Sequence, residues 1–270
     1  MIGTTFGNSA SSGGGDADAA AFISAAAITG TTQKSALNQL VLDLKGTGST
    51  TNNSDVFSEL YALYPTCPID GSTQTLTGYS FNIVDPLSYQ ITWVNAPTFD
   101  STGVIFTGTQ YGNTNFDIAT DPDSFTSFGA GVDVLSFSSG NGAFMGAYDG
   151  GSQAVQLIEL SSTFGGNIFD VYTVKATLTG GSNLKSVIRR TLSDMESYEN
   201  GISVNTNTTT ISTPSPSSAV ITIAARSSVF PKTCKLGVSF ISKGLSDNQS
   251  KDLFDSITTY NTALGRWYKH

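Results

Sequence analysis

The spacing of apolar residues changes along the chain and separates a helical part from a part built of strands. From Asp16 to Ile28 an alanine-rich run with acidic residues in its first turn predicts a helix. Gly30 is expected to close this helix. A second stripe then follows at the spacing of one helix face, formed by Leu37, Leu40, Val41 and Leu44.

The second helix is expected to be capped by Thr31 or Thr32 and to end at Lys45 and Gly46. After the spacer TGSTTNN, a third apolar face precedes Pro65 and predicts a third helix; it is formed by Val56, Phe57, Leu60 and Leu63. Three short amphipathic helices cannot bury their apolar stripes alone. We therefore expect them to pack on the domain behind them or on another subunit.

From about Tyr79 the period becomes 2, and β-branched and aromatic residues dominate between Gly, Asn and Asp. Asn200-Gly201 is the clearest hairpin turn. The spacing of the segments predicts about a dozen strands in two packed sheets, a jelly roll. The segments are YSFNIV, QITWV, GVIFTG, NFDIA, VDVLSFS, GAFMGAYD, AVQLIEL, NIFDVYTV, KSVIRRTL, SYE with ISVN, AVITIAA and KLGVSFIS.

The C-terminal end returns to helix. Ser246 and Gln249 form a capping box, and an apolar stripe runs through Leu253, Ile257, Tyr260 and Leu264. We expect this helix to lie against the sandwich. The chain thus divides into a Gly/Ser arm at 1–15, a helical lead at 16–70 and a jelly-roll domain at 71–270.

Composition narrows the possible partners. Charged residues make up 13% of the chain and the net charge is −8, so no basic stripe exists to bind a phosphate backbone, and nucleic acid is not expected as a partner. No apolar run has the length of a signal peptide or a membrane span. We expect assembly in a cytoplasm, where Cys67 and Cys234 stay as unpaired thiols.

The two ends of the chain resemble bacteriophage tail and virion-appendage proteins with a short helical lead and a concanavalin A-like, LamG-like domain. Two helix motifs of the lead carry the first part of the resemblance. They match at Asp16, Ala19, Phe22, Ile23, Ala26, Ile28, Gln33, Ala36, Leu37, Leu40 and Val41. The strand pair and the closing helix carry the rest, at Gly103, Val104, Gly108, Tyr111, Gly244, Leu245, Ser246, Asp247, Leu253, Leu264, Gly265 and Arg266.

This resemblance implies a mainly β, concanavalin-like jelly-roll sandwich with a small N-terminal helical segment and a C-terminal helix packed on it. It also implies a virion location, as a tail, fibre, baseplate or capsid-surface component, and a homo-oligomer. The arm and helices would bind other virion proteins. A receptor- or glycan-binding adhesin and a polysaccharide depolymerase are the alternatives, because one fold hosts many functions.

Catalytic residues are hard to find in this sequence. A glycoside hydrolase needs two carboxylates flanking the sugar bond, whereas Glu159 stands alone in QLIELSS and Asp194 and Glu196 lie on an expected hairpin without a third acid. The single histidine is His270, the last residue, which argues against a Ser-His-Asp triad or a histidine zinc site. We therefore expect a protein that is not an enzyme.

Two acidic loops are weak metal candidates. Asp117, Asp121 and Asp123 could bind Ca²⁺, because hard cations prefer several loop oxygens; a solvated turn is the competing interpretation. Asp149-Gly150-Gly151 could form a metal or sugar loop or an ordinary hairpin turn.

Aromatic side chains are the remaining candidates for glycan recognition. Trp93, Tyr111 and Tyr148 could stack on sugars or could belong to the core and sheet faces. The ligand-binding residues therefore stay open at this point.

Overall fold

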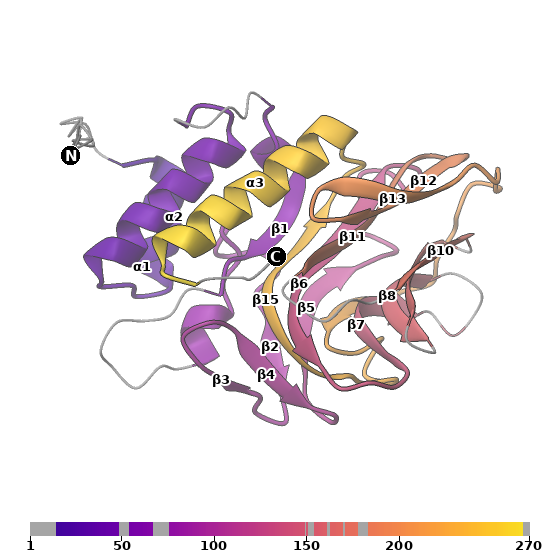
Figure 1. Ribbon diagram of the computed structural model, residues 1–270, viewed down its shortest axis with the longest axis horizontal. Coiled ribbons are helices and arrows are strands. Elements are labelled where there is room, and N and C mark those ends of the chain that lie inside the picture. The colour runs from indigo at the N-terminus through magenta and orange to yellow at the C-terminus, as the bar shows by residue number, and fades with distance from the viewer. Residues whose placement is uncertain are drawn as a thin grey trace, which may run out of the picture.

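A computed structural model describes residues 15–48, 54–66, 76–148, 150, 154–160, 163–169, 171–177 and 183–266. Over these residues the chain forms two antiparallel sheets packed face to face and three α-helices that cover one of them (Figure 1). The predicted β-sandwich with N-terminal helices and a C-terminal helix packed on it is confirmed. No helix in the described part is long and apolar enough to cross a membrane.

The first sheet has eight strands in the order β13-β12-β11-β6-β15-β4-β3, with β1 beside β15 as well. Its long central strand β15 pairs with β6 along one edge and with β4 and then β1 along the other. The strands are β1 Leu60–Tyr64, β3 Thr98–Phe99, β4 Val104–Thr107, β6 Phe128–Phe137, β11 Asn183–Thr191, β12 Asp194–Glu199, β13 Ile202–Asn207 and β15 Thr233–Ser242.

The second sheet has seven strands in the order β10-β9-β8-β7-β14-β5-β2. Successive residues of a sandwich strand point alternately to the core and to the outside, which matches the period of 2 in the sequence. The strands are β2 Thr92–Val94, β5 Tyr111–Asp117, β7 Gly142–Tyr148, β8 Ala154–Leu160, β9 Thr163–Ile168, β10 Val171–Thr177 and β14 Val220–Ile223.

Two apolar cores hold the fold. The first lies between the sheets and includes Phe116, Phe144 and Leu157. The second lies between the outer face of the eight-stranded sheet and the helices α1 (Ala17–Ala25), α2 (Thr31–Leu44) and α3 (Asp247–Ala263), and includes Phe22 and Phe240. The helices form one layer against this sheet (Figure 1).

The N-terminal helices bury their apolar faces within the same chain. Leu37, Leu40 and Leu44 of α2 are almost completely buried, in the cluster that also holds Leu253 and Ile257 of α3. The helices were expected to pack either on the domain behind them or on another subunit, and the structure shows them packed on the domain. The apolar stripes of the lead do not require another subunit.

The end of α1 differs from the expectation. Asp16 is its N-cap, and Lys45 at the end of α2 bridges to Asp16 at 2.8 Å, so the two helices lie antiparallel. The turn after α1 runs through Ala27, which has a φ of 52°, and not through Gly30. Ile28 then donates its N–H to the carbonyl of Ile23 and enters the core, which explains why the helix ends early. Gly30, and neither threonine, is the N-cap of α2.

The predicted third helix is wrong. Only the 3₁₀ turn η1, Phe57–Glu59, is helical, and the following residues form β1. Leu60 and Leu63 face the helix-covered core while Ala62 and Tyr64 face the sandwich core. A strand that is apolar on both faces cannot be distinguished from a helix by its periodicity.

The strand predicted from YSFNIV is also wrong. A second 3₁₀ turn, η2, covers Leu76–Tyr79, and the residues after it form an irregular loop. The Asn82 side chain replaces the backbone pairing of a strand there, because its Oδ1 accepts from the N–H groups of Leu63 and Val84 at 3.0 Å each.

The segment NIFDVYTV, predicted as one strand, contains parts of two strands, β9 and β10, separated by a turn at Phe169 with a φ of 53°.

Two local predictions are confirmed. Asn200 and Gly201 have φ values of 52° and 74° at the turn between β12 and β13. Ser246 accepts from the N–H of Gln249, whose side chain returns to the N–H of Ser246, so the capping box at the start of α3 is complete.

Candidate functional site

The outer faces of the two sheets differ. The helices cover the outer face of the eight-stranded sheet, whereas no described helix lies on the outer face of the seven-stranded sheet. Residues paired directly across antiparallel strands share a face. The register therefore places one row on the outer face of the seven-stranded sheet, since Met145, Leu157 and Ile223 of the neighbouring row lie in the core. The row contains Thr92, Asn113, Thr222, Gly146, Gln156 and Asn167.

This row is polar apart from Gly146, and its central part is buried. Thr222, Gln156 and Asn167 are each 1–2% exposed. Thr222 donates its hydroxyl to the carbonyl of Gly146 at 3.0 Å. The Oδ1 atom of Asn167 is enclosed and accepts no hydrogen bond from the described residues. A row of buried amides on the outside of a sheet is unusual, because buried polar groups cost free energy unless they are paired.

An arginine from another part of the chain completes this row. Arg226 follows β14, and its Nη1 donates to Gln156 Oε1 at 2.9 Å. Its guanidinium lies 4.5 Å from the centroid of the Tyr148 ring and 5.4 Å from that of Phe230. Such cation–π contacts hold a guanidinium by its flat faces and leave its edge for hydrogen bonds.

The loop that carries Arg226 has a strained backbone. Ala224, Ser227, Ser228 and Phe230 all have positive φ values, between 46° and 63°. Ser227 Oγ accepts from the N–H of Tyr148 at 2.7 Å and ties the loop to β7. Side chains with a Cβ avoid this conformation, so local packing must hold the loop in place. We name Tyr148, Gln156, Asn167, Arg226 and Phe230 the Arg226 face.

The three acidic metal candidates do not converge. Asp117 Oδ1 accepts from the N–H groups of Ala119 and Ala219, and Asp121 Oδ2 accepts from the N–H of Asp117 at 2.7 Å. The Asp123 carboxylate lies 3.7 Å from Lys243 Nζ. Across the described ranges, no three His, Cys, Asp or Glu residues are grouped to hold a metal ion. The other loop has Asp149 and Gly151 outside the described residues, and Gly150 has a φ of 85°.

The carboxylates considered for hydrolysis pair with basic residues. Glu159 is fully buried and forms an ion pair with Lys232. Arg190 lies 2.9 Å from Glu196 and 3.6 Å from Asp194. These contacts give the three acids a structural role. His270 and Cys67 lie outside the described residues, while Cys234 is a buried thiol whose pKa is raised by desolvation.

The three aromatic candidates have different positions. Trp93 packs against the sandwich core and donates its Nε1–H to Ser80 Oγ at 2.9 Å. Tyr111 is half-buried at the start of β5. Only Tyr148 belongs to the Arg226 face. The sequence offered no signal for Arg226 and Asn167, whose role depends on strand register.

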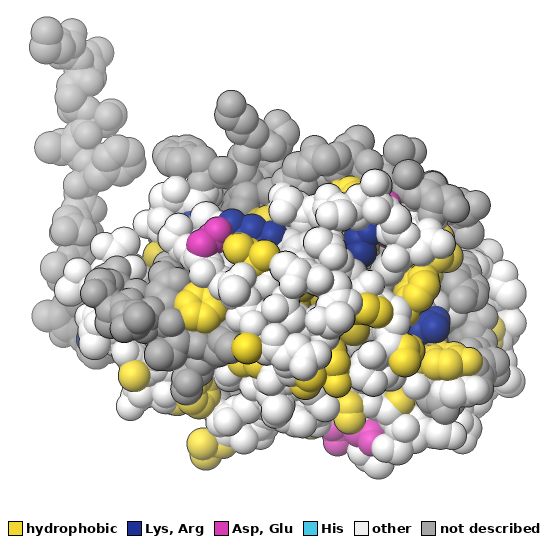
Figure 2. Space-filling view, turned by 90° about the horizontal axis from the view of Figure 1, so that it is seen from below, with side chains coloured by type: hydrophobic (Ala, Val, Ile, Leu, Met, Phe, Trp, Pro, Cys, Tyr) yellow, Lys and Arg dark blue, Asp and Glu magenta, His cyan; other side chains and the backbone are white. Residues whose placement is uncertain are grey.

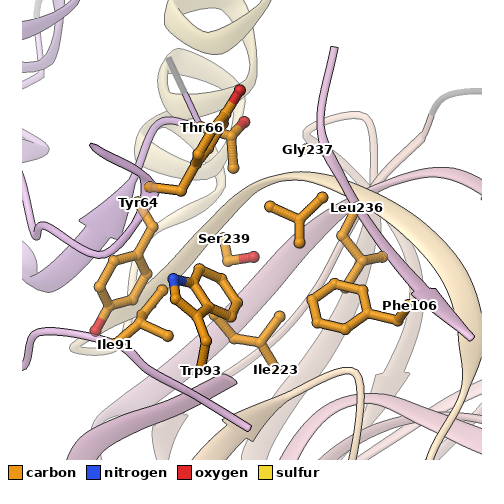
Figure 3. Close-up of a pocket in the computed structure, with 11 residues that line it drawn as sticks. Tyr64, Thr66, Ile91, Trp93, Phe106, Ile223, Leu236, Gly237 and Ser239 are labelled. Atoms are coloured by element: carbon orange, nitrogen blue, oxygen red, sulfur yellow. The ribbon is translucent and has the colours of Figure 1, made fainter. Parts of the chain in front are cut away.

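A small cavity lies inside the sandwich rather than on its surface. The rings of Tyr64, Trp93 and Phe106 surround it, together with Ile91 and Leu236 (Figure 3). Its volume is about 10 Å³, which is room for about one water molecule. It is a packing void and not a ligand site. On the outside, the surface seen from below carries few and scattered charged side chains (Figure 2).

Comparison with known proteins supports the fold. No family model and no curated protein sequence matches the chain. One similar structure is of botulinum neurotoxin type C, whose cell entry depends on interaction with two ganglioside molecules. It matches with a TM-score of 0.53 and 11% identity, over 75% of this chain and 52% of that chain. Trypanosoma rangeli sialidase with 2,3-difluorosialic acid matches with a TM-score of 0.51 and 14% identity, over 83% of this chain and 37% of that chain.

This chain spans about a third to a half of the length of those two chains. At such low identity the likeness concerns the fold alone. The comparisons therefore support a jelly-roll β-sandwich fold for this chain.

Proposed function

We propose that this protein is a non-enzymatic, lectin-like module of a bacteriophage virion that binds a glycan on the Arg226 face. The observation that carries the proposal is the difference between the two outer faces. One is closed by helices, and the other carries an arginine within cation–π distance of two aromatic rings.

The chemistry of this face suits a sugar. A pyranose ring has C–H groups that pack on aromatic side chains and hydroxyl groups that both donate and accept hydrogen bonds. Tyr148 and Phe230 supply aromatic surface, and Arg226 supplies a guanidinium that the buried amide of Gln156 holds in place. Ligand sites commonly combine apolar lining with a few placed polar groups in this way.

Binding without hydrolysis is supported by the pairing of the acids. Glu159 forms a buried ion pair with Lys232, and Glu196 forms an ion pair with Arg190; each carboxylate is thereby held in a structural contact, whereas a hydrolase needs two carboxylates that face the sugar bond. Measurement of reducing-sugar release from the polysaccharide that binds is the direct check. We expect none, and release at an enzymatic rate would favour the depolymerase alternative.

The virion location rests on the sequence resemblance of the helical lead and the closing helix. Since α1 and α2 are buried against their own domain, we assign attachment to the arm at residues 1–15. Antibodies raised against the purified chain should label phage particles, and removal of residues 1–14 should abolish incorporation while the sandwich still folds. Unlabelled particles would contradict the location without affecting the glycan site.

The glycan site is tested by an array followed by calorimetry on the best ligand. Replacement of Tyr148 by Ala should weaken binding at least tenfold, because the ring contributes packing to the ligand and holds Arg226. Ile202→Ala is the matched control, since Ile202 is a 67% exposed apolar residue on the other sheet. Equal losses in the two variants, or an array without any ligand, would refute the proposal.

A further inference from the structure

We propose that the Arg226 face selects an acidic sugar, with Arg226 holding the carboxylate of a uronate or sialate residue. This inference rests on the proposed function and names the class of glycan that the same site takes. It follows from the surroundings of Arg226 and from the way in which its guanidinium is fixed.

No carboxylate of the described residues forms an ion pair with Arg226. The only hydrogen bond from its side chain to a described residue goes to the neutral amide of Gln156. Lys232 and Lys235 form ion pairs, with Glu159 and with Asp100 at 2.6 Å. Arg189 and Arg266 form no ion pair with a described residue, but backbone carbonyls take their place as acceptors. The chain has 21 acidic and 13 basic residues, so a partly buried arginine without an acid is not explained by a shortage of carboxylates. An arginine remains charged at any working pH.

The guanidinium is held in one orientation. Tyr148 and Phe230 lie within cation–π distance of it, and Gln156, which is 1% exposed, fixes Nη1. Its Nε atom is enclosed and unpaired, whereas Nη2 is not among the enclosed atoms and makes no hydrogen bond to a described residue. The Nη2 edge therefore points to a place where an anion can accept. A fork fixed in advance binds carboxylates with little loss of side-chain freedom.

The amides beside Arg226 support the site from below. Asn167 pairs with Gln156 across β9 and β8, which places both amides side by side under the guanidinium. Both are 1–2% exposed, so a ligand meets Arg226 and the two rings and not the amides. A glycan that offers a carboxylate to the arginine and C–H groups to the rings contains an acidic sugar. A neutral sugar would leave the guanidinium without its counter-charge.

Two matched ligand pairs test the inference on the intact chain. Oligogalacturonate is compared with the same oligosaccharide in its methyl-esterified form, and sialyllactose with lactose, by calorimetry at two salt concentrations. In at least one pair we expect the acid to bind at least tenfold more tightly, with a preference that decreases as salt increases. Arg226→Gln should reduce this preference to less than threefold. Lys34→Gln, which removes the same charge from an exposed residue of α2, should leave it unchanged.

The outcomes separate the inference from the proposed function. If neutral and acidic members bind equally well, or only neutral glycans bind, the choice of an acidic sugar is wrong and glycan binding stands. If Arg226→Gln keeps the preference while its melting temperature is unchanged, another residue holds the acid. Arg226→Lys retains the charge and loses the guanidinium fork, so it should keep part of the preference. If this variant loses all glycan binding and also melts at a lower temperature, Arg226 serves folding alone and the choice of an acidic sugar is wrong. If no glycan of either kind binds, both proposals fail.

Discussion

The buried ion pair between Lys232 and Glu159 allows a quantitative test of what holds the two sheets together. Lys232 Nζ donates to Glu159 and also to the carbonyls of Ser138 at 2.7 Å and Gly140 at 2.5 Å. Both charged side chains are 3% exposed or less. The perturbation is a double-mutant cycle with Glu159→Leu, Lys232→Met and the double variant.

The expected magnitudes follow from the contacts. Either single substitution leaves a buried charge without its counter-charge, which costs about 3–5 kcal/mol of unfolding free energy. If the effects were independent, the double variant would lose about 6–10 kcal/mol. The double variant has no buried charge and loses mainly the donor to the two carbonyls, at about 1–3 kcal/mol for each one. We therefore expect a loss of about 2–6 kcal/mol and a coupling energy of about 4 kcal/mol.

Equilibrium unfolding in urea, followed by tryptophan fluorescence and circular dichroism, measures these quantities. Unchanged m-values confirm that the midpoints report stability. The control is Lys251→Met, because Lys251 forms an exposed ion pair with Asp255, and exposed pairs contribute about 0–1 kcal/mol. If the losses of the two single variants add up to that of the double variant within about 0.5 kcal/mol, the two buried charges do not stabilise each other and the argument is refuted.

Three further predictions concern single features. Ser246→Ala should cost about 1 kcal/mol of stability by removing the capping box of α3, and a loss below about 0.3 kcal/mol in urea would contradict it. Gly201→Ala should cost about 1–3 kcal/mol, since Gly201 has a φ of 74° and an added Cβ would lie 2.9 Å from Lys251 Cα; a gain in melting temperature would contradict it. Against desolvation, hydrogen bonds from Lys235 and from the loop lower the pKa of Asp100 from 3.8 to about 2. The ionised Asp100 therefore adds at most about 1 kcal/mol to the free energy of unfolding after solvent screening. This stabilisation is present above pH 3.8 and is lost as the pH falls through 2. Asp100→Asn should flatten the dependence of stability on pH in that window, and an unchanged dependence would contradict the prediction.

The sequence predicts most of this fold because local chemistry agrees with the tertiary structure. Alternating strands, the Asn200-Gly201 turn and the Ser246 capping box are all specified within a few residues. β1 was missed because it is apolar on both faces, and that pattern suits a helix equally well. The loop at Asn82 was missed because a side chain replaces backbone pairing there.

The Arg226 face could not have been predicted from the sequence. Its members come from β7, β8, β9 and the loop after β14, and only strand register brings them together. In the segment AARSSVF, Arg226 has no neighbours that distinguish it from a surface arginine. The acidic candidates show the opposite relation between sequence and structure. Asp117, Asp121 and Asp123 are close in sequence, but their hydrogen bonds serve the loop itself.

The position of β15 in the centre of the eight-stranded sheet has a consequence for synthesis. This strand, Thr233–Ser242, joins β6 to β4 and β1, and α3 follows it to complete the layer over α1 and α2. More than two hundred residues must leave the ribosome before that sheet can close. Closure of this sheet therefore waits for β15 and is expected to be slow, as in other proteins dominated by distant pairings. A chain that stops before residue 233 would leave β6, β4 and β1 without their shared partner and would expose strand edges that favour aggregation.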